Sequence, residues 1–327
     1  MICPNDTFTY FSSVNFETLG YHILSSIEIP LHVFAGYIIL SKTPAKMQSV
    51  KWALFNLHIW SSSLDISISL LATPYILFPE ITGYPFGLLA WLGVPARYLT
   101  WFLVAQVGIM LNSMAVLYEN RYSCLVRSSN FWRRARISYL AVAYFVALFY
   151  ITPFMAQIPD QDEAVAQTLK NLPEIRCVYD GPLFVFTLEP RVFGVVTMTK
   201  LIVEFVSMVT LVVMTFRILR GNTESSLSQN TLKMQRKFFV TLMIQTSIPF
   251  IVVLLPLCYY VFSMTQNYFS QSINNICLLI ISSHGLVSTV AMLLLHQPYR
   301  ETTFEMFCKK RTTRTSSRVA DSQASAK

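Results

Sequence analysis

Seven long apolar stretches divide this chain, and they limit its possible folds more than any other feature. Each supplies the roughly 20 apolar residues that an α-helix needs to cross a hydrocarbon core about 30 Å thick. The chain is 54% hydrophobic and 13% charged, too little charge to cover a soluble protein of 327 residues. We therefore predict an all-α membrane protein built as a seven-transmembrane helix bundle. The predicted spans are residues 17–41, 52–78, 88–118, 137–157, 192–219, 237–263 and 269–295.

Lys and Arg residues collect in alternate segments between these stretches. The first, third and fifth loops with their flanks, and the C-terminal tail, carry 20 of them, whereas the N-terminal tail and the other loops carry four. Because basic residues stay on the cytoplasmic side, this bias predicts an extracellular N-terminus and a cytosolic C-terminus. The net charge of +8 is thus a topology signal and not a sign of nucleic-acid binding. The predicted units are an extracellular tail (1–16), a receptor domain (17–295) and a cytoplasmic tail (296–327), which is the plan of a G-protein-coupled receptor.

Polar and kinking residues inside the spans are candidates for a switch in the bundle core. Asp65 lies mid-span among serines, and an ionisable residue in hydrocarbon is costly enough to be a functional candidate by default. Pro249 and Pro256 lie on one face of the sixth span and form either a hinge for its cytoplasmic end or ordinary kinks. Lys200 and Glu204 are spaced to pair along one helix face. The sequence shows no catalytic constellation and no metal-ligand spacing, so we expect neither enzymatic activity nor a cofactor.

The cytoplasmic end of the third span reads Tyr118-Glu119-Asn120-Arg121-Tyr122. An acid followed by an Arg-Tyr pair at this place is typical of the G-protein contact of rhodopsin-like receptors, although here one inserted Asn separates the acid from the pair. We expect Glu119 to hold the Arg121 guanidinium in the inactive state. Arg121 and Tyr122 would then reach the G protein when the bundle opens. The alternative is that Arg121 only anchors the span at the cytoplasmic face.

A short amphipathic segment follows the seventh span. It begins with His296-Gln297-Pro298-Tyr299-Arg300, in which we assign Pro298 and Tyr299 to the bundle switch. Apolar residues then recur at helical spacing ahead of a basic cluster. These residues are Phe304, Phe307 and Cys308, followed by Lys309, Lys310 and Arg311. The pattern predicts a short interfacial helix on the lipid bilayer with a palmitoyl group on Cys308. The Ser- and Thr-rich residues 312–325 suit phosphorylation by a receptor kinase and binding of arrestin.

The predicted extracellular side carries modification sites and candidate ligand contacts. The sequon Asn5-Asp6-Thr7 predicts glycosylation of Asn5. Cys3 and Cys177 are the cysteines predicted to lie outside, where oxidation is favoured, and they either pair or stay free. A small-molecule pocket opening outward would be lined mostly by apolar and aromatic groups, each of which is alternatively a packing residue. The candidates are Tyr98, Trp101, Phe102, Tyr259, Tyr260 and Asn274.

Short motifs along nearly the whole chain resemble the nematode serpentine receptors of class H. They are Ile29-Pro30-Leu31-His32, Lys42-Thr43-Pro44, Ser49-Val50-Lys51-Trp52, Asn56-Leu57-His58, Leu77-Phe78-Pro79, Glu119-Asn120-Arg121-Tyr122 and His296-Gln297-Pro298-Tyr299-Arg300. The resemblance implies chemosensation, in which an external odorant, tastant or pheromone binds the bundle and activates a heterotrimeric G protein. It also implies a multi-pass protein of the plasma membrane, in the cilia of sensory neurons. The Cys-Trp-any-Pro and Asn-Pro-any-any-Tyr motifs of rhodopsin-like receptors are missing, which leaves their standard activation steps in doubt.

A multi-span transporter or a ligand-gated channel subunit is the main alternative. Transporters usually contain internal repeats with paired broken helices, and no repeat is detectable here. An odorant-gated channel of the insect kind has its N-terminus inside, which the charge bias opposes. A retinal protein would need a lysine in the last span, and residues 269–295 contain none.

Overall fold

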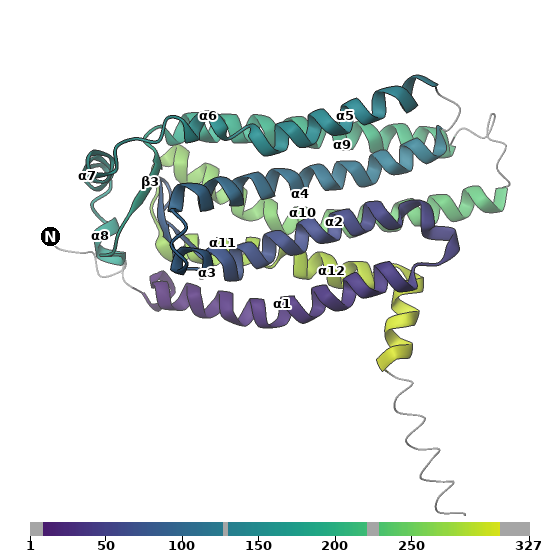
Figure 1. Ribbon diagram of the computed structural model, residues 1–327, viewed down its shortest axis with the longest axis horizontal. Coiled ribbons are helices and arrows are strands. Elements are labelled where there is room, and N and C mark those ends of the chain that lie inside the picture. The colour runs from purple at the N-terminus through teal and green to yellow at the C-terminus, as the bar shows by residue number, and fades with distance from the viewer. Residues whose placement is uncertain (1–8, 127–129, 221–228, 308–327) are drawn as a thin grey trace, which may run out of the picture.

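The computed structural model describes residues 9–126, 130–220 and 229–307, which form a bundle of long helices lying side by side (Figure 1). The helices of the bundle are α1 (Val14–Lys42), α2 (Gln48–Ile66), α4 (Ala96–Leu125), α5 (Asn130–Phe149), α9 (Pro190–Arg220), α10 (Gln229–Gln266), α11 (Gln271–Ser282) and α12 (His284–Leu295). Six stretches within the described residues are long and apolar enough to cross a membrane. They correspond to α1, α4, α5 with the short α6 (Thr152–Met155), α9, α10, and α11 with α12.

The remaining long helix, α2, lies inside the bundle. It continues through a π-helical turn, η3 (Ser67–Ala72), and it packs against α1, α4 and α12. Its residues Ser61, Ser62 and Asp65 are all buried. Because protein and not lipid surrounds these side chains, α2 tolerates polar groups that would be costly against hydrocarbon. With α2, the structure confirms the predicted bundle of seven helical crossings.

A small antiparallel sheet covers the end of the bundle at which α1 begins (Figure 1). Its strands are β1 (Pro74–Ile76), β2 (Ile81–Pro85) and β3 (Phe184–Thr187), paired in that order. A Cβ atom at Gly83 would lie 2.1 Å from the Tyr75 carbonyl oxygen, so this pairing requires glycine. Short helices surround the sheet and connect it to the bundle. They are η1 (Tyr10–Ser12), α3 (Leu88–Trp91), α7 (Gln161–Asn171) and α8 (Ile175–Val178), and η2 (Ala45–Met47) joins α1 to α2.

The helix boundaries depart from the predicted spans where turns interrupt an apolar run. The span expected over 52–78 stops being helical at Ala72, because Thr73 adopts a left-handed conformation ahead of Pro74. The span expected over 88–118 begins only at Ala96, after a turn at Gly93 with φ of +83°. The span expected over 269–295 is interrupted at Ser283. Mean hydropathy is insensitive to such breaks because the residues that form them are themselves apolar or small.

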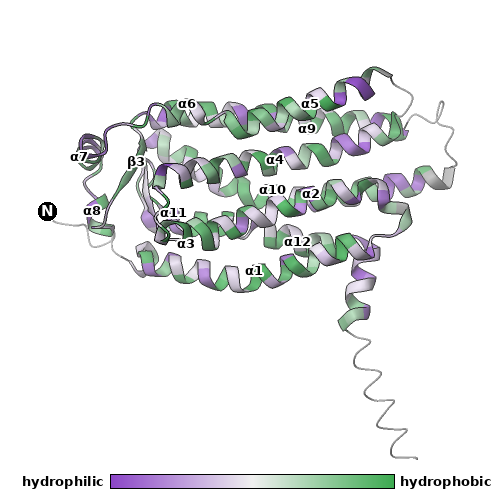
Figure 2. Ribbon diagram, in the orientation of Figure 1, coloured by the Kyte–Doolittle hydropathy of each residue, from purple (hydrophilic) through white to green (hydrophobic). Residues whose placement is uncertain are grey.

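A further helix over 297–307 leaves the bundle at the end opposite the sheet (Figure 1). It occupies the segment for which the sequence predicts an interfacial helix. Its Phe304 and Phe307 are 55% and 70% exposed, and the Phe307 ring lies 5.6 Å from the Phe34 ring of α1. Figure 2 shows hydrophobic residues along much of α5, α9 and α10, with hydrophilic ones towards the ends of α5 and α10 opposite the sheet, whereas α1 and α2 carry both kinds along their length. The pattern of α5 and α10 is typical of helices that span a bilayer.

Candidate functional site

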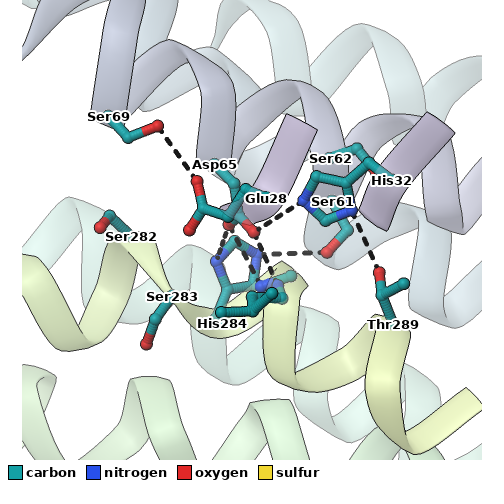
Figure 3. A network of polar contacts seen from close by, with 12 residues as sticks. Glu28, His32, Ser61, Ser62, Asp65, Ser69, Ser282, Ser283, His284 and Thr289 are labelled. Carbon is teal, nitrogen blue, oxygen red and sulfur yellow. Dashed lines mark hydrogen bonds and ion pairs between the residues drawn. The ribbon is translucent and has the colours of Figure 1, made fainter. Parts of the chain in front are cut away.

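Asp65 lies at the centre of a buried polar network that joins α1, α2 and α12 (Figure 3). Its Oδ1 is 2.8 Å from Nδ1 of His284, and its Oδ2 is 3.3 Å from Nε2 of His32. The backbone N–H groups of Gly285 and Leu286 donate to the same carboxylate at 3.1 and 2.8 Å. The side chains of Asp65 and His284 are fully buried. The partners that an intramembrane acid needs are therefore supplied by two neighbouring spans.

The break at Ser283 creates the half of this site that belongs to α12. Because α11 ends at Ser282, the first N–H groups of α12 have no preceding helical carbonyl to bond. A helix N-terminus also carries partial positive charge, which stabilises an anion placed against it. Gly285 permits the close approach, since a Cβ atom there would lie 2.4 Å from Oδ2 of Asp65. A helix break and a glycine together thus make a binding place for one carboxylate.

A second layer of polar side chains surrounds the carboxylate. Nδ1 of His32 is 3.2 Å from the Thr289 hydroxyl, and Nε2 of His58 is 3.0 Å from the His32 carbonyl oxygen. Oε2 of Glu28 accepts a hydrogen bond from Ser69 at 3.1 Å (Figure 3). Oε1 of Glu28 is buried and has no hydrogen-bond partner within the described part of the chain. A shift of α12 relative to α2 would break the contacts of the Asp65 carboxylate with His284, Gly285 and Leu286 at the same time.

Among the residues that the structure describes, no group of three or more His, Cys, Asp or Glu side chains is arranged to hold a metal ion.

The expected contact between Glu119 and Arg121 is replaced by another. Both oxygens of Glu119 are engaged by α5: Nε of Arg136 lies 2.9 Å from Oε2, and Nε1 of Trp132 donates to Oε1 at 3.1 Å. No ion pair joins Glu119 to Arg121, two residues that the structure describes. The Arg121 guanidinium instead lies over the Phe238 ring of α10, 4.1 Å from its centroid. Residues two positions apart on a helix do not face each other, which is why Glu119 and Arg121 of α4 find different partners here. That Glu119 holds Arg121 in an inactive state stays a prediction.

A cavity of about 430 Å³ lies beside Arg121, at the end of the bundle opposite the sheet. Its walls come from η2, α4, α10 and the start of the 297–307 helix. The lining residues are Pro44, Met47, Arg121, Met234, Gln235, Lys237, Phe238, Thr241, Leu295, His296, Gln297, Pro298 and Arg300. Tyr299, next to the cavity in sequence, is buried and lies 2.9 Å from the Thr43 hydroxyl. Nε2 of His296 is 2.7 Å from Oε1 of Gln245, so α10 and the end of α12 are directly joined.

The remaining switch candidates lie on helices that contact these groups. Pro249 and Pro256 are both buried within α10, between the cavity and the opposite end of that helix. Tyr122 packs its ring against Trp132 at 5.3 Å, beside the Glu119 contact. Lys200 and Glu204 pair as predicted along α9, with Nζ 2.6 Å from Oε1.

The candidate pocket residues divide into two groups near the sheet. Tyr260 stacks on Phe78 with ring centroids 4.3 Å apart, its hydroxyl donates to the Asn274 carbonyl oxygen at 3.3 Å, and Tyr259 lies beside it. The Asn274 side chain is fully buried, and its Oδ1 has no hydrogen-bond partner among the described residues. Trp101 packs in a separate cluster, and Phe102 is half-buried next to it in sequence. Tyr98 is 50% exposed at the start of α4, so it lies apart from both groups.

The predicted modification sites are only partly within the described residues. Cys177 is disulfide-bonded. Its expected partner Cys3 lies outside the described residues, as do Asn5 and Cys308.

Several residues of the site were not singled out from the sequence. His284, Gly285 and Arg136 act through contacts between helices, and no spacing within one span reveals such contacts. The Ser282-Ser283-His284-Gly285 segment was the available signal, since small and polar residues in mid-span suggest an interruption. Phe238 carried no signal, because a phenylalanine in an apolar span is ordinarily a packing residue.

Two comparisons with known proteins bear on this arrangement. A family model described as "Serpentine type 7TM GPCR chemoreceptor Srh" matches residues 12–309. The chain is also 29% identical over 304 residues to "Serpentine receptor class H-72" of Caenorhabditis elegans, which covers 88% of this chain and 85% of that receptor.

Proposed function

Since the chain belongs to the Srh family of serpentine seven-transmembrane chemoreceptors, we propose that it binds an external small molecule and activates a heterotrimeric G protein. Membership of this family identifies the chain as a GPCR-like chemosensory receptor of the membrane. The identity of the ligand class, the coupling to a G protein and the direction of the chain in the membrane belong to the proposal. The bias of basic residues supports a multi-pass arrangement with the N-terminus outside. Membership of a chemoreceptor family supports the plasma membrane, including the ciliary membrane, as its location.

The observation that carries the proposal is the environment of Arg121. Its guanidinium is buried against Phe238 of α10 at one wall of a cavity that lies at the basic end of the bundle. A cation–π contact is weaker than a buried ion pair, so it can be exchanged for contacts with a partner. If the end of α10 moves outward, Phe238 leaves Arg121 and the cavity widens. Arg121 then becomes available to the G protein.

Two features of the bundle support a route from the ligand to this cavity. Pro249 and Pro256 interrupt the hydrogen bonds of α10, which gives that helix places to bend. His296 at the end of α12 contacts Gln245 of α10, so a shift of α12 reaches α10 directly. Upstream on α12, His284 is bound to Asp65. A ligand that displaces α11 near Asn274, and with it the adjoining α12, would therefore disturb Asp65 and α10 together.

The experiment is expression in cultured cells with a second-messenger readout, first against a panel of volatile and water-soluble compounds. With an agonist in hand, Arg121→Ala is expected to abolish the response or reduce it by at least about tenfold, with unchanged surface expression. Lys233→Ala is the matched control, because Lys233 is an exposed cation on α10 that does not line the cavity. If the agonist responses of Arg121→Ala and Lys233→Ala were equal, Arg121 would have no role in coupling and would only anchor the span at the cytoplasmic face.

A further inference from the structure

The cavity beside Arg121 has a charge composition that favours an anion. The charged residues that line it are Arg121, Lys237 and Arg300, and no Asp or Glu is among its lining residues within the described part of the chain. Arg121 is 6% exposed, whereas Lys237 and Arg300 are exposed. The cavity thus has one deep cation and two outer ones. Cations that face one enclosed volume repel one another, and an anion bound between them relieves that repulsion.

Arg121 in particular lacks the partner that a buried cation requires. Its Nε is buried with no acceptor, and it forms no ion pair or hydrogen bond with another described residue. The Phe238 ring lies against one face of the guanidinium and leaves its N–H edge unbonded. Two acids adjacent in sequence to the lining residues are already engaged. Glu119, two residues before Arg121, binds Arg136, and Glu301, next to Arg300, accepts from Gln297 at 2.8 Å. A buried guanidinium without an acceptor is costly, so an acceptor from outside the chain is favoured.

The helix over 297–307 adds positive potential to the same cavity. Its first residues, Gln297 and Pro298, line the cavity, so the N-terminal end of the helix borders it. The N–H groups of a first helical turn point out of that end and favour phosphate and other anions. The helix also presents exposed Phe304 and Phe307, which suit burial at a membrane surface. The cavity is therefore positioned where lipid headgroups occur.

We propose that this cavity binds the phosphate groups of an inositol-phosphate headgroup, presented by a lipid of the adjoining leaflet. Guanidinium groups bind phosphate oxygens in pairs, and several cations around one volume suit a multiply charged headgroup. The volume of about 430 Å³ lies in the range of small-molecule sites. This inference goes beyond the proposed coupling and does not rest on it, since headgroup binding needs no G protein and no agonist.

The test uses the full-length receptor in phosphatidylcholine nanodiscs, without a G protein. A fluorescent short-chain phosphatidylinositol bisphosphate is titrated and its anisotropy measured, with inositol trisphosphate and inorganic phosphate as competitors. We expect saturable binding that weakens as NaCl is added. Lys237→Ala and Arg300→Ala should each weaken it about three- to fivefold, as expected for exposed ion pairs, and the double variant should weaken it more. Both positions are exposed, so these variants should fold even if Arg121→Gln does not.

Lys233→Ala is again the matched control and should bind as the unmodified receptor does. Competition by inositol trisphosphate only at concentrations well above those of the lipid would support a lipid source. Equal competition by inositol trisphosphate or by inorganic phosphate would overturn the lipid source and assign the site to a soluble anion. Absence of saturable binding, or equal losses in Lys237→Ala, Arg300→Ala and Lys233→Ala, would overturn the site itself. Agonist signalling is not measured in this experiment. A negative result would therefore not contradict the proposed G-protein coupling, which the Arg121→Ala signalling experiment tests separately.

Discussion

Gly285 has no side chain, and this allows α12 to approach Asp65 of α2, which also contacts α1. Replacing it by alanine places a Cβ atom 2.4 Å from Oδ2 and 2.8 Å from Cγ of Asp65. Neither atom can give way freely, because two backbone N–H groups and two histidines hold the carboxylate. We expect Gly285→Ala to lower the free energy of unfolding by about 1–3 kcal/mol, the usual cost of overpacking. The measurements are the melting temperature of the purified receptor and its surface expression.

Gly194 provides the control for that substitution. It lies on α9, where an added Cβ atom would meet the Met264 side chain at 3.5 Å, an ordinary contact. Gly194→Ala should therefore leave the melting temperature unchanged or raise it slightly, since alanine favours a helix over glycine. Equal melting temperatures for the two variants would show that Asp65 does not need to approach α12.

The candidate ligand contacts make a second prediction at the scale of single residues. Trp101 and Tyr260 lie in packed aromatic clusters near the sheet, whereas Tyr98 is half exposed at the start of its helix. If the ligand binds between these clusters, Trp101→Leu and Tyr260→Leu should each shift agonist potency by about tenfold, in line with the loss of an aromatic contact. Tyr98→Ala should leave the dose–response curve unchanged. The pocket lies elsewhere if none of the three variants alters any agonist's potency while surface expression is retained.

At the scale of elements, hydropathy predicts the long helices well and the turns between them poorly. The run from Leu70 to Phe78 contains helix, a left-handed turn and a strand, yet it is apolar at nearly every position. The sheet escapes prediction because β1 and β2 have only three and five residues, and β3 joins them from about 100 positions away. The same limit applies to the site. Asp65 and Arg121 could be recognised as charges near or inside a span, but their partners lie on other helices.

The ion pair between Glu119 of α4 and Arg136 of α5 is predicted to stabilise the packing of these two helices. Glu119 is fully buried, and its charged partner Arg136 is 35% exposed. Arg136→Ala leaves a buried carboxylate with Trp132 alone, so we expect a loss of about 1–3 kcal/mol in the free energy of unfolding. The loss should be much smaller when Glu119→Gln is already present, because no buried charge is then left unpaired. A double-mutant cycle on thermal unfolding measures the difference, and additive losses would mean that the pair does not join the two helices.

The whole molecule has two chemically different ends. The end at which α1 begins carries the sheet, α7 and α8, whereas the other end carries the cavity and the 297–307 helix (Figure 1). Two of the cations at that second end, Lys237 and Arg300, line the cavity, so charge that directs insertion can also bind a partner or a lipid. The predicted topology and the proposed binding site therefore involve some of the same basic residues. The sequence alone predicts which loops are basic, but only the folded bundle shows which basic residues surround a common volume.

The orientation of the molecule is the last prediction. Twenty basic residues on one set of segments against four on the other imply an outer N-terminus and a cytosolic tail. We expect glycosylation at Asn5, so that Asn5→Gln and Thr7→Ala each cause the same loss of apparent mass as glycosidase treatment. The two substitutions remove the sequon at different residues, which separates loss of the glycan from a local effect of either side chain. Protease added to intact cells should leave an epitope placed after Arg311 uncut, whereas permeabilised cells should lose it. Cleavage of that epitope in intact cells would reverse the orientation and defeat the proposed coupling, since the Arg121 cavity would then face outward.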